Sequence, residues 1–417
     1  MRTNQKCEQI SAQNIQNPLF LRSFFRNFVA STKVINMKKS LFPLFVALLL
    51  AGCGSKNVPT VSEGRTAQTE NLFQNLMLLT DSTVYMFGHQ DDPCYGVGWV
   101  GDSARSDVRS TCGDLPAVIG FDLGHIELGD AFNLDGVPFD RMRREIIDHF
   151  DRGGVVTLSW HLNNPLSGGT AWVADSLRAV EANTVAAVLE GGSCHELFLT
   201  WLDRVAQFLN SLETSYGVRV PVVFRPWHEH SGSWFWWGHD HCTDQQYKDL
   251  WRLTADHLRE QGVSNVLYAY SPGTEADGDE TRYMERYPGD DIIDLLGLDC
   301  YCYAPDADTT LMNTYAATLD KNLSMVCRLA KEHQKAAALT ETGYESLPYS
   351  NWWTAILNPV LQRHPVSYVL VWRNAHDKAG HFFAPYPGQT SSSDFVSFYN
   401  LPQTLFLHDV NALYLEH

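Results

Sequence analysis

Two glutamates of this chain are placed to act together in acid–base and nucleophilic chemistry. Glu229 lies in the run PVVFRPWHEHSGSWFWWG (residues 221–238), between two histidines and near four tryptophans. Glu341 lies much later, in the run ALTETGYE. Two carboxyl groups on either side of a glycosidic bond can hydrolyse it, one as proton donor and the other as nucleophile or base. A separation of about 5–5.5 Å suits retention of configuration at the sugar, and a wider one suits inversion.

The surroundings of the two glutamates favour different roles. A carboxylic acid that must hold its proton near neutral pH needs an apolar site or negative neighbours, which raise its pKa. Trp227 and the aromatic run 234–237 can give Glu229 such cover. A nucleophile needs hydrogen-bond donors that keep it ionised. Tyr301 is placed to donate to Glu341, because it ends the neighbouring predicted strand.

The elements that carry these residues alternate along the chain. Eight short runs rich in Val, Ile, Leu, Phe and Tyr are each followed by loop residues and then by a helical pattern, such as the amphipathic segments 139–150, 196–212 and 244–261. This alternation predicts a parallel sheet, and its span suits a (β/α)8 TIM barrel that forms a single catalytic domain. An open doubly wound sheet is the alternative, but no predicted strand ends in a glycine-rich phosphate loop. The predicted strands are residues 83–90, 117–124, 154–161, 220–229, 265–273, 293–301, 335–345 and 366–374.

Polar residues stand at the carboxyl ends of the predicted strands. In a TIM barrel these ends meet at one face, which holds the active site. Any single one is more often a cap, a turn former or half of a salt bridge, but the whole set is harder to explain in that way. Glu229 and Glu341 end the fourth and seventh strands and are therefore expected to face each other across the mouth of the barrel. The set consists of His89, Asp122, His161, Glu229, Asp299, Tyr301, Glu341 and Trp372.

Five motifs together resemble those of the family-26 glycoside hydrolases, chiefly bacterial β-mannanases. They are RPWHEHSGSWFWWG, the ETG that begins at Glu341, the strand end GLDCY, the run VLVWRNA and, on the first strand, FGHQDD. A Trp-His-Glu tripeptide alone would be a weak signal, but the set is specific in this order and at these strand ends. The resemblance extends over roughly residues 75–415. It implies a TIM barrel that cleaves internal β-1,4-mannosidic linkages in mannan, galactomannan or glucomannan by double displacement, with retention.

The resemblance also implies roles for residues at the matching positions. Glu229 would be the acid/base and Glu341 the nucleophile. His228 would contact both the substrate and the nucleophile. Tyr301 would hydrogen-bond the nucleophile, and Asp299 would orient that cluster.

Four further residues match positions that bind the sugars. Trp234 would line the sugar sites, and Trp372 would form the floor beneath the sugar at the cleavage point, with Arg373 beside it. His161 would reach a neighbouring sugar. A saccharide site of this kind combines an aromatic face for the axial C–H bonds with polar groups for the hydroxyls.

Other activities remain open from the sequence. The enzyme could release mannobiose from chain ends, or could cleave mixed-linkage β-glucan or β-1,3-xylan, which are also activities of the family. Two long loops, residues 167–195 and 231–242, could block one end of the cleft. A different class is a non-catalytic glycan-binding lipoprotein, but such a protein would be expected to lack one of the two carboxylates.

A metal site is a further alternative, because His228, His230, His239 and His241 are close in the sequence. They lack the i, i+4 helical spacing of HExxH, and a strand end would fix no third ligand. The C-Y-C run at 300–302 places two thiols on one face of a strand, which is not a usual zinc half-site. We therefore expect neither a metal nor a cofactor.

Composition argues against some partners. The chain has 31 Lys and Arg against 48 Asp and Glu, a formal net charge of −17. So acidic a surface repels phosphate backbones, which argues against nucleic acid and leaves neutral polysaccharides open. Aromatic residues make up 12% of the chain, and such rings can stack on sugars as well as fill a core.

The amino-terminal region has the layout of an export signal. A short basic stretch, MKKS (37–40), precedes the apolar run LFPLFVALLL (41–50), which is too short to span a bilayer as a helix. The LAGC that ends at Cys53 resembles the bacterial lipoprotein box. Cys53 is therefore expected to carry a lipid that anchors an exported protein to the cell envelope, at the outer membrane. The predicted divisions are an extension at 1–36 that could precede the true start, a lipoprotein signal peptide at 37–52, a tether at 53–75 and the catalytic domain at 76–417.

Seven cysteines follow Cys53 in the sequence. An odd number leaves at least one thiol unpaired. Cys94 with Cys112, and Cys194 with Cys242, lie in predicted loops and could form disulfides.

Overall fold

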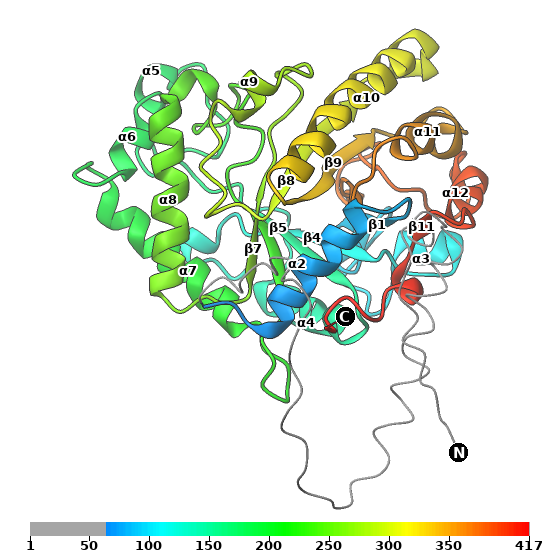
Figure 1. Ribbon diagram of the computed structural model, residues 1–417, viewed down its shortest axis with the longest axis horizontal. Helices are drawn as coiled ribbons and strands as arrows, with labels where there is room; N and C mark the ends of the chain where they lie inside the picture. Colours follow the sequence, from blue (N-terminus) through cyan, green and yellow to red (C-terminus); the bar gives the residue numbers. More distant parts are fainter. Residues whose placement is uncertain (1–63, 417) are drawn as a thin grey trace, which may run out of the picture.

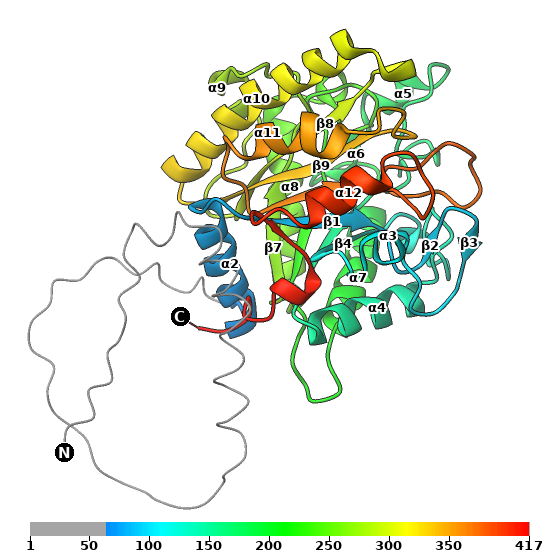
Figure 2. The ribbon, with the colours of Figure 1, turned by 90° about the vertical axis from the view of Figure 1, so that its right-hand side faces the viewer.

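Eight parallel strands close into a barrel in the computed structural model, which describes residues 64–416 (Figures 1 and 2). In the order β1-β4-β5-β6-β7-β8-β9-β10 each strand pairs with the next, and β10 pairs with β1 to complete the circle. This confirms the TIM barrel and all eight predicted strands, each of which is shorter than its predicted run. The barrel strands are β1 Tyr85–Gln90, β4 Val118–Asp122, β5 Val155–Ser159, β6 Val222–Arg225, β7 Val266–Tyr270, β8 Leu295–Cys302, β9 Ala336–Tyr344 and β10 Tyr368–Val371. Three minor strands are β11 Thr404–Leu405, which pairs with β1, and β2 Tyr95–Gly96, which pairs with β3 Trp99–Val100.

Helices surround the barrel (Figure 1). The three helices expected at 139–150, 196–212 and 244–261 are observed as α4, α7 and α8. In α8, Thr243 and Gln246 form a reciprocal capping box at the first turn, and a buried apolar stripe faces the barrel. The helices around the barrel are α3 Asp107–Cys112, α4 Phe139–Asp151, α5 Arg178–Glu181, α6 Thr184–Val188, α7 His195–Ser211, α8 Asp244–Glu260, α9 Glu280–Met284, α10 Thr309–Glu332, α11 Asn358–Leu361 and α12 Ser392–Tyr399. Short helical turns are η2 Ile126–Leu128, η3 His239–His241, η4 Pro305–Ala307, η5 Trp353–Leu357 and η6 Leu407–Asp409.

The first described helix, α2 (Ala67–Thr80), closes the amino-terminal end of the barrel and is drawn in blue in Figure 1. Its Leu72, Leu76 and Leu79 side chains are fully buried. They belong to one apolar cluster with residues from all eight barrel strands. The helix is therefore part of the folded domain, because the barrel would otherwise expose this cluster to water.

The described chain begins and ends at this same end of the barrel. Arg65 forms an ion pair with Asp294, just before β8, with 2.5 Å between Nη2 and Oδ1. Asn75 in α2 donates to the carbonyl of Leu413 at 3.0 Å. The carboxyl ends of the strands, where the candidate site is expected, therefore lie at the opposite end.

The tether expected at 53–75 is wrong for residues 67–75, which are helical. Their polar neighbours hid the i, i+4, i+7 spacing of the three buried leucines. Residues 1–63, with the expected extension, signal peptide and Cys53, lie outside the described residues, as does residue 417. Within residues 64–416, no helix combines the length and the apolar character that crossing a membrane requires.

A bulge in β9 places two carboxylates side by side at the carboxyl end of the barrel. β8 and β9 pair in register until Asp299, which pairs with Glu341 and leaves Thr340 as an extra residue. Bulges of this kind are frequent next to active sites, because they redirect side chains. Gly297 makes room for this one, since a Cβ there would lie 2.5 Å from Oγ1 of Thr340.

The seven described cysteines are all free thiols. The disulfides considered for Cys94 with Cys112 and for Cys194 with Cys242 are therefore not formed in this structure. Instead, the sulfur of Cys242 lies 3.6 Å from Nη1 of Arg286.

The role of α2 can be tested with two leucines on opposite faces of the helix. We expect Leu76→Ala to lower the free energy of unfolding by about 2–5 kcal/mol, because it removes buried methyl groups and leaves a cavity. Leu78 is 42% exposed, so Leu78→Ala should change it by less than about 0.5 kcal/mol. Urea and thermal unfolding of both variants measure the difference. Equal stability of the two variants would mean that α2 is not packed on the barrel.

Candidate active site

A buried arginine organises the carboxyl end of the barrel. Arg225, the last residue of β6, is 1% exposed. Its Nη1 donates to Oδ2 of Asp299 at 2.8 Å and to Oγ of Ser271 at 3.2 Å, and its Nη2 donates to Oε2 of Glu341. Burial alone would lower the pKa of Arg225, but Asp299 and Glu341 outweigh it and raise the pKa, so the guanidinium stays charged. The sequence analysis missed this residue, whose signal is a charged side chain inside an otherwise apolar strand.

Both carboxylate oxygens of Glu341 accept hydrogen bonds. Oε2 accepts from Arg225, and Oε1 accepts from the hydroxyl of Tyr301 at 2.5 Å. The second contact is the one expected from the positions of the two strands. Asp299 affects Glu341 indirectly, through Arg225. Its Oδ2 accepts from Arg225, and its Oδ1 accepts from the hydroxyl of Thr340 at 2.7 Å. A cation and a hydroxyl donor together favour a negatively charged Glu341.

Glu229 lies in a turn beyond β6 rather than at its end. The strand stops at Arg225, before Pro226, which has no backbone N–H to continue the ladder, so the predicted strand 220–229 is too long. The φ angle of Glu229 is 53°, which is uncommon for a residue other than glycine. Its N–H donates to the carbonyl of Ser271 at 2.8 Å, which fixes the turn to the segment after β7.

The carboxyl group of Glu229 is set to hold a proton. Burial raises its pKa well above the usual range, and the charges of Glu341 and Asp299 raise it further. Two causes oppose them: the hydrogen bond from Nε1 of Trp234 to Oε2 at 2.8 Å, and the charge of Arg225. The environment of Glu229 therefore suits a proton donor, and that of Glu341 suits a carboxylate.

His161 is held at the mouth of the barrel by Asp122, the last residue of β4. Its Nδ1 lies 2.6 Å from Oδ2 of Asp122, and its backbone N–H donates to Oδ1 at 3.1 Å. Oγ of Ser159 also donates to Oδ2, at 2.6 Å. Burial alone would raise the pKa of Asp122, but His161 and Ser159 outweigh it and lower the pKa to about 2. Burial likewise opposes protonation of His161, but Asp122 raises its pKa above the usual value.

His228 contacts His161 rather than Glu341. The two Nε2 atoms lie 3.0 Å apart, and the ring of Phe235 lies 5.3 Å from that of His228. Burial, the charge of His161 and the charge of Arg225 lower the pKa of His228 well below its usual value. A neutral His228 can thus accept the Nε2–H of a protonated His161. The contact with the nucleophile implied by the resemblance is not a hydrogen bond in this structure.

The residues after β10 reach another part of the mouth. The ring of Trp372 lies 6.1 Å from that of His161. Nε of Arg373 lies 3.2 Å from Oδ1 of Asp135, and its Nη1 lies 3.5 Å from the hydroxyl of Tyr95. Asp135 comes from the loop after β4, and Tyr95 comes from the short strand β2, which follows β1; the sequence analysis singled out neither residue. Arg373 is therefore held from two sides.

A cleft of about 440 Å³ opens on the Glu229 side of this mouth. One wall is made by the two long loops, which join each other: Val173 donates to the carbonyl of Trp234 at 2.8 Å, and Trp236 donates to that of Ala171 at 3.1 Å. The cleft is lined by Trp172, Glu229, Trp234, Gly273, Thr274, Glu275, Asp299, Cys300, Tyr301, Tyr303, Leu311, Thr314, Tyr315 and Thr318.

The histidines considered as metal ligands have separate environments. His228 pairs with His161, and His230 packs between two tyrosine rings. Nε2 of His241 lies 2.9 Å from the carbonyl of Ser233, and His239 is exposed. Across residues 64–416, no three His, Cys, Asp or Glu side chains form a group that could hold a metal ion.

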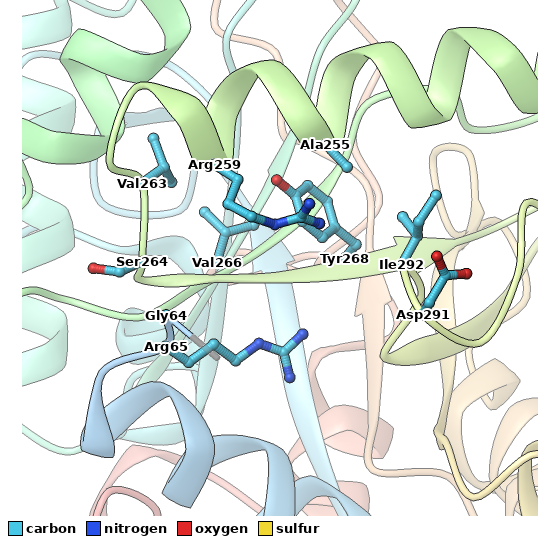
Figure 3. Close-up of a pocket in the computed structure, with 10 residues that line it drawn as sticks. All are labelled: Gly64, Arg65, Ala255, Arg259, Val263, Ser264, Val266, Tyr268, Asp291 and Ile292. Atoms are coloured by element: carbon cyan, nitrogen blue, oxygen red, sulfur yellow. The ribbon is translucent and has the colours of Figure 1, made fainter. Parts of the chain in front are cut away.

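A second cavity, of about 350 Å³, lies at the opposite end of the barrel beside α8 (Figure 3). Arg65, Arg259, Tyr268 and Asp291 are among the residues that line it. Asp291 is the one carboxylate among its lining residues in the described chain, so the cavity holds no pair of carboxyl groups. The cleft beside Glu229, in contrast, is also lined by Asp299 and Tyr301.

Comparison with known proteins agrees with this geometry. The model of glycosyl hydrolase family 26 matches residues 61–374. The chain is 34% identical over 309 residues to a mannan endo-1,4-β-mannosidase of Bifidobacterium adolescentis, a match that spans 73% of this chain and 30% of that protein. It is 27% identical over 354 residues to an enzyme of the same name from Bacillus subtilis, with 81% of this chain and 89% of that protein covered. Its fold is similar to the structure of a GH26 β-mannanase from Bacteroides ovatus, with a TM-score of 0.80, 52% identity and coverage of 85% of this chain and 99% of the other.

The link between Asp122 and His161 predicts a shift in a titration. We expect Asp122→Asn to lower the pKa of His161, because the amide keeps the shape of the carboxylate but not its charge. Ser159→Ala is the matched control, because it removes one hydrogen-bond donor to Asp122 but leaves the negative charge of Asp122 beside His161. The pKa of His161 should therefore fall less in Ser159→Ala than in Asp122→Asn. NMR titration of the imidazole nitrogens measures both, with the His161 signals assigned by their loss in His161→Asn. An unchanged titration in Asp122→Asn would contradict the link.

Proposed function

The chain belongs to glycosyl hydrolase family 26, and on that premise we propose that it hydrolyses internal β-1,4-mannosidic linkages of mannan, galactomannan or glucomannan with retention of configuration. The names of its relatives in Bifidobacterium and Bacillus support the substrate. The observation that carries the mechanism is the unlike setting of two carboxyl groups. Glu341 is held by Arg225 and Tyr301, whereas Glu229 is half-buried and has a pKa that desolvation and the nearby carboxylates raise.

The first step uses Glu341 as nucleophile and Glu229 as acid. One carboxylate oxygen of Glu341 forms a bond to the anomeric carbon while Glu229 gives its proton to the glycosidic oxygen, and the bond between that carbon and oxygen breaks. The leaving chain departs as an alcohol and the sugar stays as an ester of Glu341. Arg225 and Tyr301 keep the carboxylate pointed at the sugar, so little reorganisation is needed as the bond forms.

The second step reverses the roles. Glu229, now a carboxylate, takes a proton from water while the water oxygen attacks the anomeric carbon and the ester bond breaks. Esterification removes the negative charge of Glu341, which is one of the causes that raise the pKa of Glu229. Glu229 can therefore remain ionised long enough to act as a base and regains its proton when the carboxylate of Glu341 returns.

The neighbouring residues bind the sugars in this proposal. Trp372 forms the floor under the reacting sugar, and Arg373 and His161 reach the sugar beyond it. His228 supports His161 through their shared hydrogen bond. Trp234 both contacts the leaving side and donates to Glu229.

Two substitutions and a rescue test this assignment. Glu229→Ala and Glu341→Ala should each lower kcat on mannan by about 10³-fold or more with the fold intact, because each removes a group that acts on the reacting atoms. Azide should partly restore Glu341→Ala and give a glycosyl azide of inverted configuration, since it enters the space of the lost carboxylate. Chromatography of the products and their anomeric NMR signals are the readouts.

A matched control is Glu280→Ala, which removes an exposed glutamate paired with Arg328 and should leave activity unchanged. Near-normal activity of Glu341→Ala would refute the assignment. Binding of mannan without turnover by the wild type would support a non-catalytic glycan-binding protein. Turnover confined to β-glucan or β-1,3-xylan, or release of mannobiose alone from chain ends, would favour the alternative activities.

We further propose that Cys53 carries a lipid anchor that holds the exported protein at the outer membrane. Support comes from LAGC at 50–53, which directly follows the apolar run 41–50. The backbone N–H of Thr66 donates to the carbonyl of Ser264, just before β7, at 3.0 Å, so the chain joins the barrel at its amino-terminal end. An anchor on that side would leave the cleft facing away from the membrane.

The anchor proposal predicts that Cys53→Ser moves the protein out of the membrane fraction and abolishes its labelling by fatty acid. The full chain is expressed in a bacterial host that processes lipoproteins, and the two fractions are compared. Cys112→Ser, which changes a thiol of the folded domain, should keep the label. Equal labelling of wild type and Cys53→Ser would rule out the anchor.

A further inference from the structure

His230, the residue after the candidate acid, is buried without a hydrogen-bond partner. It is 3% exposed, and among the described residues neither of its ring nitrogens has a partner. Burying polar atoms in this way costs free energy, because the hydrogen bonds that they made to water are not replaced. Proteins tend to keep such a cost at sites where a function depends on the local structure. In the proposed function, however, His230 neither binds a sugar nor transfers a proton.

Two tyrosine rings enclose the ring of His230. The ring of Tyr247 in α8 lies 4.3 Å from it, and that of Tyr270, the last residue of β7, lies 5.0 Å from it. The hydroxyl of Tyr247 donates to the carbonyl of Trp227 at 2.7 Å. The hydroxyl of Tyr270 donates to the carbonyl of Tyr283, also at 2.7 Å. Both tyrosines are therefore fixed, and they contact His230 with their rings rather than through a hydrogen bond.

The imidazole of His230 stays neutral in this position. Burial lowers its pKa well below the usual value, and the charges of Arg286 and His239 lower it further. The guanidinium of Arg286 lies over the ring of Tyr247, 5.6 Å from its centre, so a second cation between the two tyrosines would be repelled. His230 therefore acts through the shape of its ring and not through a charge.

The turn that carries Glu229 is held between β7 and α8. The N–H of Gly232 donates to the carbonyl of Glu229 at 3.1 Å and closes the turn. The N–H of Glu229 donates at 2.8 Å to the carbonyl of Ser271, which directly follows β7. His230 lies within this turn and packs it against α8 through the ring of Tyr247. The ring of His230 thus fixes the side of the turn that the hydrogen bond to Ser271 does not reach.

The backbone of Glu229 depends on this support. Its φ of 53° is uncommon for a residue other than glycine, and such a conformation persists only where the surroundings fix it. Without the ring of His230, a space would open beside the turn and this φ could relax. The carboxyl group would then move, although proton transfer requires it to lie within hydrogen-bond reach of the oxygen that it protonates.

We propose that His230 is a positioning residue for the acid/base, an inference that rests on the proposed function. Its ring keeps the turn where Glu229 can protonate the glycosidic oxygen. His230 does not line the cleft, so it acts through Glu229 and not on the substrate. Because the ring is needed only for its size and flatness, phenylalanine can replace it.

The test compares two leaving groups. Mannohexaose loses an alcohol, which departs only when Glu229 gives it a proton, whereas 2,4-dinitrophenyl β-mannobioside loses a phenolate that needs no proton. His230→Ala should lower kcat/KM on mannohexaose by about tenfold or more, because a displacement of about 1 Å can cost about 10²-fold. The loss on the dinitrophenyl substrate should stay below about twofold. Chromatography measures the first reaction, and the absorbance of the released phenolate measures the second.

A conservative variant and a matched control accompany His230→Ala. His230→Phe should keep kcat/KM on both substrates within about twofold of the wild type without a lower Tm, since phenylalanine has no polar atoms to leave unpaired. His149→Ala removes another buried histidine, in α4, whose Nε2 lies 3.1 Å from the carbonyl of Ala117. It should lower the Tm but keep wild-type kcat/KM on both substrates. If His230→Ala does not fold, His230→Leu takes its place, with the same selective loss expected.

The outcomes separate the role of His230 from the proposed function. Equal losses of His230→Ala on the two substrates, or wild-type rates on both, would overturn the proposal, as would a loss in His230→Phe as large as that in His230→Ala. Glu229→Ala should show the same selective loss. An equal loss of Glu229→Ala on both substrates, or no cleavage of mannohexaose by the wild type, would refute the proposed function itself. If Glu229→Ala shows the selective loss and His230→Ala does not, only the role of His230 fails.

Discussion

Arg225 is a cation enclosed inside a barrel, and the surrounding structure must neutralise it. Moving an ion out of water costs several kcal/mol unless partners with good geometry replace the water. The partners here are Asp299 on β8 and Glu341 on β9, which the bulge at Thr340 brings opposite each other. Removal of Arg225 would leave both buried carboxyl groups without their cation, so the register of three strands and the position of the candidate nucleophile depend on the same interaction.

The same interaction decides which carboxyl group can change its charge during the reaction. Both oxygens of Glu341 accept hydrogen bonds, one from a guanidinium and one from a hydroxyl, which is an arrangement that suits a carboxylate. Desolvation and the negative charge of Glu341 both raise the pKa of Glu229, so the protonation of Glu229 responds to what happens at Glu341. The positive φ of Glu229 fits this view, because a strained backbone persists only where its surroundings fix it, and here the carbonyl of Ser271 does so.

Local patterns predicted those parts of the structure that depend on periodicity and on strand ends. The eight strands, three of the helices, the family and the convergence of Glu229 with Tyr301 and Glu341 at one end of the barrel all followed from the sequence. Arg225 was missed because its importance arises from a register slip in a neighbouring strand pair, which no local pattern reveals. The pairing of the long loops beside Trp172 depends on backbone hydrogen bonds between distant segments, which side-chain types do not encode. The α2 helix was missed because its three buried leucines are spread among polar residues.

The two ends of the barrel are specialised for opposite tasks. At the amino-terminal end, α2 contributes its leucines to an apolar cluster that every barrel strand enters, and both ends of the described chain are tied down there. At the carboxyl end the loops instead leave Trp172 and Tyr303 exposed beside buried charges. A polysaccharide is longer than any site that cuts it, so the substrate must run across an open surface of the protein. Because α2 covers the amino-terminal end of the barrel, it stabilises the core and leaves the carboxyl end free for the substrate to enter and leave.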